Sequence, residues 1–475
     1  MLSSDFQHQL NQLDSTDEQF VEQALELIYQ LDPEMLRNQQ SLLSSISLLI
    51  ADIDAAISTQ VSEILHHPEF SALEASWSGV ESLVSLPINY HKTNVRLLDF
   101  SWDELSHELN SSVSLRRTTL FNLIGNKELN TSGGKPFGMV VVDHDISMNL
   151  DGDYDDIYTL ELLSELGDLC LCPFILSMAE DFFGESGADW LSDTQRIEKI
   201  LAGAEYQSWQ RLREKSSSRF IGVVMPKVRF RHAYNHSDSN QIVFSERHRS
   251  PSGVWGNAGY LFASTAMREF NRINWFGFMK SRWQDKYAGA LVNVPESSAQ
   301  TLVHREPRAD INIFTPMGIF YSDHGFIPLC HSSTTEKYFF RGNPSIWNCE
   351  SDDLEAVNGQ IQTTLMICRV AHYLKVQIRG MIGNFQTADE CELFLNNWLD
   401  KYTSNLVNAD EATLAKYPLS KGRVIVKEIA GQKGRFTCDV HVKPQYQFDN
   451  VCGEVLLSTD LGPETGGTGY QGGLR

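Results

Sequence analysis

The chain lacks the features that mark secreted, membrane-spanning and nucleic-acid-binding proteins. Its first residues, MLSSDFQHQLNQLDS, contain neither the basic cluster nor the apolar core of a secretory signal. Its longest apolar runs fall far short of the roughly 20 residues that cross a bilayer. The 39 Lys plus Arg are outnumbered by 61 Asp plus Glu, and a net charge of −22 repels phosphate backbones and anionic membrane surfaces. We therefore expect a cytoplasmic protein without nucleic-acid partners or membrane insertion.

Cysteine is also sparse. The chain has eight cysteines in 475 residues, a density far below that of a disulfide scaffold. Cys368 and Cys438 occupy apolar patterns, in which a thiol behaves as a small hydrophobic side chain. Hydrophobic residues make up 42% of the chain and charged residues 21%, as in ordinary folded proteins. We expect reduced, buried thiols in a chain of two or three domains.

Residues 1–67 predict a helical N-terminal arm. Ser15 and Glu18 have the spacing of a capping box, and apolar residues follow at helical spacing up to an Asp-Pro pair. A longer helical pattern covers about 34–67, and Pro68 marks the start of a third helix.

Residues 68–350 predict a central α/β body, because strand and helix patterns alternate there. The segment FGMVVVDH at 137–144 is almost continuously apolar, as in a strand buried on both faces. The polar, turn-rich segment 232–253 predicts an exposed loop. Strands are expected at 95–100, 137–144, 172–178, 219–225, 310–315 and 337–341, and helices at 156–169 and 255–273.

Residues 351–461 predict a C-terminal α+β domain, which follows a linker at 342–354 and precedes a flexible Gly-rich tail at 462–475. Two helices are expected at about 355–382 and 388–403, the second capped by Thr387. A β-hairpin follows, with strands at 424–429 and 435–442. One face of its second strand is apolar, and an exposed edge of such a hairpin could pair with another chain. The fold class is therefore mixed α+β and α/β.

Two glycine motifs resemble phosphate-binding loops but lack the required context. GTGYQG at 467–472 matches the dinucleotide pattern, yet no helix follows it. GGK at 133–135 is followed by Pro136 instead of the Ser or Thr that would bind Mg²⁺. We interpret the first as tail and the second as a turn into a strand, and we expect no cofactor.

The acidic run at 151–155 resembles the start of a calcium loop. Asp156 stands where the loop needs Gly, and Leu162 where it needs a bidentate Glu. A solvated loop and helix start is the simpler interpretation. Cys368 and His372 lie one helical turn apart, but no further ligand is near them in sequence, so His372 is interpreted as a core residue. We expect no metal site.

Asp143 and Asp145 are the best candidates for catalysis, because they flank His144 at the end of a buried strand. With a further acid they could supply the acid and base of glycoside hydrolysis, although the spacing fixes no such pair. The further acids considered are Glu161, Glu180 and Asp181.

Several colinear blocks resemble one family, the large subunit of the bacterial type VI secretion contractile sheath (TssC or VipB). The N-terminal blocks are ISTQVSEILHHPEFSALEASWSGVESLV at 57–84 and SGGKPFGMVVVDH at 132–144. The later ones are WQRLREKSSSRFIGVVMP at 209–226, VWGNAGYLFAS at 254–264, RVAHYLKVQIRGMIGNF at 369–385 and RVIVKEIAGQKGRFTCDVHVKPQYQF at 423–448. The chain departs from the family pattern after Pro226, around 310–321 and in the 232–253 segment.

The resemblance implies a structural protein rather than an enzyme. In the family, the large subunit pairs with a small sheath subunit (TssB or VipA), and these heterodimers assemble on a baseplate into a helical sheath around a tube of Hcp hexamers. Sheath contraction propels the tube, and a ClpV-type AAA+ ATPase recycles the contracted sheath. Two alternatives stay open: the sheath of another phage-tail-like contractile device, and a cytoplasmic hydrolase that uses Asp143 and Asp145.

The resemblance also suggests three assembly sites, each with a plainer alternative. The hairpin would pair with strands of other subunits, or would be an ordinary surface hairpin; its residues are Val424, Val426, Phe436, Cys438, Val440 and Val442. The helix at 388–403 would face the tube, or would be a plain solvated surface, through Asp389, Glu390, Glu392 and Asp400. The first helix would be captured by the ATPase, or would pack at the partner interface, through Phe20, Ala24, Leu25, Ile28 and Leu31.

Overall fold

The chain forms two compact units in the computed structural model. One comprises Met1–Glu74 and Arg231–Val254, and the other Ala75–Phe230 and Trp255–Arg475. The structure describes residues 15–31, 39–131, 133–149, 153–185, 187, 189–234, 244–246, 253–276, 308–333, 337–348, 358–379, 387–404, 411–428, 436–444 and 455–461. The domain boundaries expected after residues 67, 350 and 461 stay predictions.

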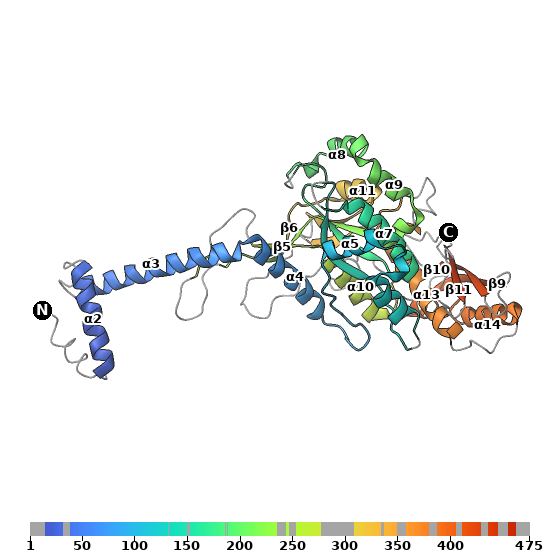
Figure 1. The fold of residues 1–475 in the computed structure, drawn as a ribbon, viewed down its shortest axis with the longest axis horizontal. Coiled ribbons are helices and arrows are strands. Elements are labelled where there is room, and N and C mark those ends of the chain that lie inside the picture. The colour runs from blue at the N-terminus through green and yellow to red at the C-terminus, as the bar shows by residue number, and fades with distance from the viewer. Residues whose placement is uncertain are drawn as a thin grey trace. The chain divides into compact units, whose positions relative to one another are not determined.

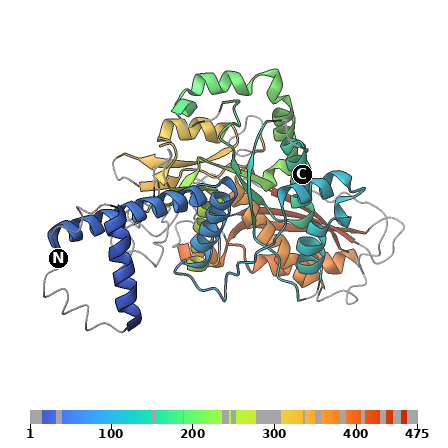
Figure 2. The same cartoon turned by 60° about the vertical axis from the view of Figure 1, so that its left-hand side comes forward.

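The helical prediction for the N-terminal residues is confirmed. The helices are α2 (Ser15–Leu31), α3 (Gln39–Leu65) and α4 (Pro68–Val84), and α3 is continuous along its length (Figures 1 and 2). Pro68 begins α4 because a proline at the first helical position loses no hydrogen bond and already has helical φ.

The body is built on a five-stranded sheet in the order β1-β2-β3-β7-β8. The first four strands in this order run parallel, and β8 is antiparallel to β7. The strands are β1 (Val140–Ile146), β2 (Phe174–Met178), β3 (Ile221–Met225), β7 (Phe326–Ser332) and β8 (Lys337–Phe340). β2 and β3 are buried along their whole length, as expected of central parallel strands. β1 was expected to be buried on both faces, but it is an edge strand and its three valines are half-buried.

Helices pack around this sheet, and several begin where capping residues predict. Ser101 and Glu104 form a complete capping box on α5, and Asp155 caps α7. The helices are α5 (Trp102–Ser111), α6 (Thr119–Phe121), α7 (Asp156–Cys170), α8 (Thr194–Leu201), α9 (Gln207–Glu214), α10 (Gly259–Ile273) and α11 (Thr315–Asp323). Short 3-10 helices are η2 (Leu115–Arg117), η4 (Asp189–Ser192), η5 (Ala204–Tyr206) and η6 (Ser216–Phe220), and η3 (Asn122–Leu129) is a π-helix.

Two expected strands in this region are wrong. Residues 95–100 pair with no strand, and Leu97 and Leu98 are exposed, so alternation alone did not give them a sheet to join. In place of a strand at 310–315, the two-residue β6 (Arg308–Ala309) pairs with β4 (Val228–Arg231), and α11 already begins at Thr315. The other neighbour of β4 is β5 (Val254–Gly256). Strand β7 was not predicted.

The C-terminal part combines helices with a three-stranded antiparallel sheet in the order β11-β10-β9. Its elements are α13 (Ile361–Arg379), α14 (Ala388–Asp400), α15 (Glu411–Lys416), β9 (Leu419–Glu428), β10 (Phe436–Pro444) and β11 (Val455–Leu461). The predicted hairpin and the cap of α14 by Thr387 are confirmed. β11 was not predicted. Cys438, Val440 and Val442 are buried on one face of β10, as the alternation indicated.

Candidate assembly surfaces

The carboxylate proposed for hydrolysis at Asp145 is part of an ion-pair group. Its Oδ2 lies 3.1 Å from Nζ of Lys227, which also lies 3.5 Å from a Glu180 carboxylate oxygen. Burial opposes the charged form of Lys227, but the two carboxylates outweigh it and raise the pKa of the ammonium. Asp145 therefore holds β1 to the short connection between β3 and β4.

Asp143 lies two residues before Asp145 on β1 and is the exposed residue of this strand. Surrounding protein atoms desolvate its carboxyl and raise the pKa, and hydrogen bonds with Ser76, Tyr260 and Asn257 oppose that rise. The described parallel strands follow one another in chain order, so their order has no reversal of the kind at which α/β enzymes bind ligands. The geometry gives Asp143 and Asp145 structural partners and does not pair them around a substrate.

The neighbouring acidic residues and His144 also have structural partners. The His144 ring stacks on Trp102 with centroids 4.2 Å apart, and its Nε2 lies 3.1 Å from Asp156 Oδ2. Burial would raise the pKa of Asp156, but hydrogen bonds from His144 and the Ser147 amide lower it overall. The other two acids, Glu161 and Asp181, contact the Lys215 ammonium and the Ser147 hydroxyl. These contacts fasten α5, α7 and β1 together.

The weak sequence motifs are explained by packing where the structure describes them. Gly133 has a φ of +81°, so GGK forms the predicted turn, and Glu128 accepts the Lys135 amide. Asp155 is a helix cap and Asp151 lies outside the described residues. The GTGYQG motif also lies outside them. Among the described residues, no cluster of His, Cys, Asp and Glu has the arrangement of a metal site.

The predicted state of the thiols is confirmed for the cysteines that the structure describes. Cys170, Cys172, Cys330, Cys368, Cys391 and Cys438 are all free and buried. Burial raises the pKa of the Cys170 and Cys330 thiols to about 12, which keeps them protonated and unreactive at neutral pH. Cys349 and Cys452 lie outside the described residues. His372 is a buried core residue, as predicted, and its Nε2 lies 3.1 Å from the Leu171 carbonyl.

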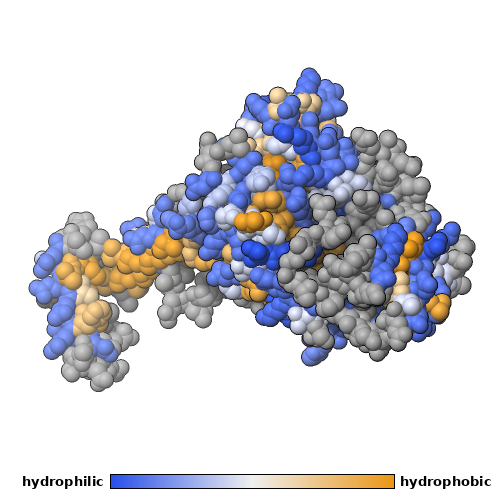
Figure 3. All heavy atoms as spheres, turned by 45° about the vertical axis from the view of Figure 1, so that its right-hand side comes forward, coloured by the Kyte–Doolittle hydropathy of each residue, from blue (hydrophilic) through white to orange (hydrophobic). Residues whose placement is uncertain are grey.

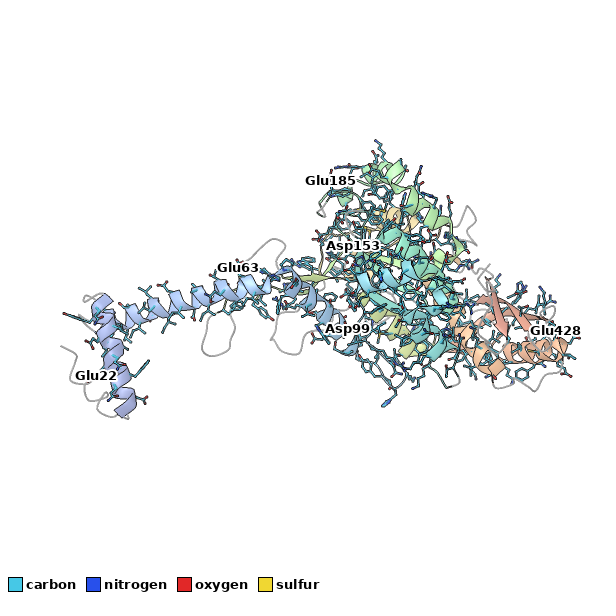
Figure 4. All side chains as sticks on the ribbon, in the orientation of Figure 1. Glu22, Glu63, Asp99, Asp153, Glu185 and Glu428 are labelled. Carbon is cyan, nitrogen blue, oxygen red and sulfur yellow. The ribbon has the colours of Figure 1, made fainter. Side chains whose placement is uncertain are left out.

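Among the described elements, helix α3 carries the most exposed large apolar side chains. Its exposed apolar residues include Leu43, Leu48, Ile50, Ile53 and Ile64, all more than half exposed, whereas Leu42 is buried. Figure 3 shows this surface as an orange stretch along α3. Polar side chains such as Glu63 also project from the helix (Figure 4). Contiguous apolar surfaces of this kind mark interaction sites.

Length and composition alone would also let α3 cross a membrane. Gln40–Leu65 is the one described helix that meets both criteria, with 11% of its most apolar window buried. The sequence analysis expected no apolar run long enough to cross a bilayer. That expectation rested on unbroken apolar stretches, and serines and acidic residues interrupt the apolar pattern of α3. Asp52, Asp54 and Glu63 lie within it, and they favour an interface that also contains water or polar groups.

The predicted ATPase-binding residues lie on α2 with mixed exposure. Phe20 is 73% exposed, and Ala24, Leu25 and Ile28 are partly exposed. The side chain of Leu31 lies outside the described residues. The helix itself is confirmed, while its binding role stays a prediction.

A buried ionic cluster joins the segment after β4 to the helices of the first unit. The Arg231 guanidinium contacts both carboxylate oxygens of Glu74 and donates to Glu246 at 2.8 Å. Glu246 is 1% exposed, accepts the Tyr234 amide at 3.0 Å, and lies 2.9 Å from His66 Nε2. The expectation that 232–253 is an exposed loop is therefore wrong at Glu246. This glutamate can be buried because the Arg231 guanidinium neutralises its carboxylate.

The hairpin residues proposed for intersubunit pairing lie inside the C-terminal sheet. β10 has β9 on one side and β11 on the other, so its proposed residues hydrogen-bond within the chain. These are Phe436, Cys438, Val440 and Val442. Val424 and Val426 lie on β9, whose outer edge faces α14. Pairing between subunits stays a prediction, and β11 is the strand with an open side in the described sheet.

Helix α14 places its acidic residues in two different settings. Asp389, Glu390 and Asp400 are exposed, whereas the Glu392 carboxylate accepts the Val426 amide at 3.0 Å. The apolar face of this helix packs on the core through Cys391, Phe394, Leu395 and Trp398, while Tyr402 is 40% exposed. A role facing the tube stays a prediction for the three exposed acids.

Comparison with known proteins identifies both halves of the chain. Residues 47–347 match VipB, the EvpB/VC_A0108 tail sheath N-terminal domain, and residues 350–461 match VipB_2, the EvpB/VC_A0108 tail sheath gpW/gp25-like domain. The chain is 28% identical to the type VI secretion system sheath protein TssC1 of Pseudomonas aeruginosa over 468 residues, which cover 92% of this chain and 91% of that protein.

A solved sheath tail protein from Desulfitobacterium hafniense aligns with 65% of this chain and 62% of its own, at 10% identity and a TM-score of 0.27. The two VipB matches together extend from residue 47 to residue 461, through the body and the C-terminal sheet. The chain belongs to the VipB family of type VI secretion tail sheath proteins.

Proposed function

We propose that this large sheath subunit pairs with a small sheath subunit, and that the heterodimers assemble into a contractile helical sheath around an inner tube. The observation that carries the proposal is the match to both sheath domains over most of the chain. The proposed work is mechanical: many equivalent interfaces repack together when the sheath contracts. No step in it needs a catalytic group, which agrees with the structural partners of Asp143 and Asp145.

The exposed apolar side chains of α3 support an obligate partner. Fully burying one large aliphatic side chain is favourable by about 1.5–3 kcal/mol, so four of them on one face would contribute substantially to an interface. They are Leu43, Ile50, Ile53 and Ile64, while Leu48 lies on the other side of the helix. We assign this face to the small sheath subunit, since its interspersed carboxylates suit a protein surface better than lipid.

The finer contacts are proposed from exposure and charge. The exposed acids of α14 would face the inner tube, which would then present basic or polar groups to them. Phe20 on α2 would anchor the helix in a groove of the recycling ATPase, as amphipathic helices commonly bind. A baseplate would nucleate the assembly. The buried thiols agree with a reducing compartment such as the cytoplasm.

Co-expression tests the main proposal. The full chain is produced alone and with candidate small acidic proteins from the same gene neighbourhood, and the preparations are viewed by negative-stain microscopy. Hollow tubules only in the co-expressed sample are expected. Well-behaved monomers in both samples would refute a sheath function, and tubules from the chain alone would instead indicate a one-protein sheath of a phage-like device.

A further inference from the structure

Side chains of α14 occupy the outer edge of β9 at Val424 and Val426. Val424 donates its amide to Asn396 Oδ1 at 2.8 Å, and its carbonyl accepts from Asn396 Nδ2 at 2.9 Å. Val426 donates to Glu392 at 3.0 Å. These bonds are the ones that a neighbouring strand would otherwise make.

The chain just after α14 closes the start of the same edge. Leu419 donates its amide to the Tyr402 carbonyl at 3.2 Å and accepts from the Ser404 amide at 2.9 Å, as in a short parallel bridge. Between these sites, a Cβ on Gly422 would lie 2.4 Å from a Leu399 methyl group. Glycine at this position therefore lets α14 approach β9 closely.

The spacing of the two side chains matches the repeat of the strand. Glu392 and Asn396 are four residues apart, which is about 6.0 Å along a helix. Val426 and Val424 are two residues apart, which is about 6.8 Å along an antiparallel strand. Because α14 and β9 run in opposite directions here, consecutive turns of the helix meet consecutive outward-facing amides. An asparagine amide offers both an acceptor and a donor, so Asn396 reproduces the pattern of a strand residue.

β11 forms the opposite edge of the sheet, and no strand in the described part of the chain pairs with its outer side. The amides of Val424 and Val426 point away from β10, so those of their partners Val440 and Cys438 point toward β11. There they form hydrogen-bonded pairs with Leu457 and Thr459. The amides of Leu456, Ser458 and Asp460 consequently point away from β10. This edge can accept a further strand.

We propose that Glu392 and Asn396 form an edge guard, a pair of side chains that occupies the outer edge of β9 and so directs strand addition by a neighbouring sheath subunit to β11. This inference rests on the proposed assembly function. It makes Glu392 and Asn396 specificity-determining residues for subunit pairing, and it removes Glu392 from the set of acids that face the tube. A sheet with two open edges could pair with a neighbouring subunit at either edge, or form aggregates that are not sheaths.

Hydrogen exchange on the full chain, in its heterodimer with the small subunit, tests the guard directly. Asn396→Leu should speed exchange of the Val424 amide about tenfold, and Glu392→Leu should do the same at Val426, because each loses its acceptor. Glu392→Gln keeps an acceptor and should leave Val426 slow. Asn397→Leu is the matched control, since Asn397 is exposed on the same helix. Unchanged exchange in Asn396→Leu and Glu392→Leu would refute the guard.

Comparison of free heterodimer and assembled sheath separates the guard from the proposed function. We expect Val424 and Val426 to be slow in both states, and Ser458 and Asp460 to become slow only in the sheath. Protection that appears at Val424 and Val426 only on assembly would overturn the guard. Protection at neither edge on assembly would also overturn the proposal, because there would be no strand addition to direct, whereas tubules in the same sample would still support the proposed function. The double variant Glu392→Leu/Asn396→Leu should form aggregates or irregular tubules, whereas Asn397→Leu should form normal ones.

Discussion

Helices α3 and α13 are both apolar and have opposite surroundings. α13 is buried on most of its circumference, in a core that it shares with the central sheet and the C-terminal sheet. Its buried residues are Ile361, Leu365, Met366, Ile367, Cys368, Val370, Ala371 and Leu374. On α3, by contrast, Leu42 is the one large apolar side chain of the described helix that is buried. The other buried residues of this helix are Ser58 and Ser62. Both helices are rich in apolar residues, α3 more so, yet the fold buries mainly those of α13.

The difference separates apolar surface that serves folding from apolar surface that serves assembly under the proposed function. A buried residue of α13 contributes to the free energy of unfolding of this chain, while an exposed residue of α3 would contribute to the free energy of binding the proposed partner. Substitutions in the two helices should therefore affect different measurements.

The largest effect on stability is expected in α13. Leu365→Ala should lower the free energy of unfolding by about 2–5 kcal/mol, because it removes buried methyl groups and leaves a cavity. Urea unfolding followed by circular dichroism measures the change. Ile53→Ala on α3 is the control and should change it by less than about 0.5 kcal/mol. Equal effects of the two substitutions would contradict the contrast between the helices.

The next largest effect is expected in the ionic cluster of the first unit. Glu246→Ala should lower the free energy of unfolding by about 3 kcal/mol, because it leaves the buried Arg231 with Glu74 as its remaining charged partner. Thermal unfolding measures it, with Glu63→Ala on the exposed side of α3 as the control. A loss no larger than that of Glu63→Ala would show that the cluster contributes little.

The same carboxylate predicts a dependence on pH. Burial alone would raise the pKa of Glu246, but hydrogen bonds from Arg231 and the Tyr234 amide lower it below the usual 4.5. A lowered pKa means that the stabilisation is complete above pH 4.5 and is lost as the pH falls through the folded-state value. The protection factor of the Tyr234 amide, which is its exchange rate relative to the intrinsic rate at the same pH, should fall over that range in the wild type and should already be low at neutral pH in Glu246→Ala.

A smaller effect on stability, with a large effect on binding, is expected on α3. Replacement of Ile50 and Ile53 together by serine should change the free energy of unfolding by less than about 1 kcal/mol. The variant should nevertheless lose co-purification with the small subunit, because the apolar contact is gone. Size-exclusion chromatography of the co-expressed pair measures this. Retained binding at wild-type strength would place the partner elsewhere.

The smallest effect is expected at Asp143. Asp143→Ala removes an exposed carboxylate that is not part of the ion pair of Asp145, so assembly into tubules should be unchanged. Negative-stain microscopy of the co-expressed variant is the measurement. Loss of tubules with a normally folded heterodimer would show that this rim of β1 contacts another subunit.

Much of the local structure could be predicted from the sequence because its signals lie within a few residues of one another. The capping box of Ser101 and Glu104, the alternation along β10, and the core position of His372 depend on such short spacings. The strand expected at 95–100 was wrong for the converse reason: a strand exists only where a partner strand lies, and alternation does not specify the partner.

The candidate sites were less predictable, because their contacts join residues far apart in the chain. Glu74 and Arg231 are separated by 157 positions, so nothing in the polar segment after Arg231 indicated that Glu246 would be buried. Glu392 resembled an ordinary surface acid until its contact with the Val426 amide was seen, 34 positions away. A signal did exist for Asn396, as an amide one turn from Glu392 on a helix beside a predicted hairpin, but the sequence does not place the helix along the edge.

The sequence by itself therefore determined the helices, the buried thiols described here, the outline of a strand-and-helix body and, through its colinear blocks, the sheath family. The tertiary structure alone decided which apolar helix is buried, which acids are neutralised and which edge of the C-terminal sheet is closed. The physical reason is that periodicity and capping depend on interactions within one or two turns, whereas burial and edge pairing depend on which distant segment comes to lie alongside.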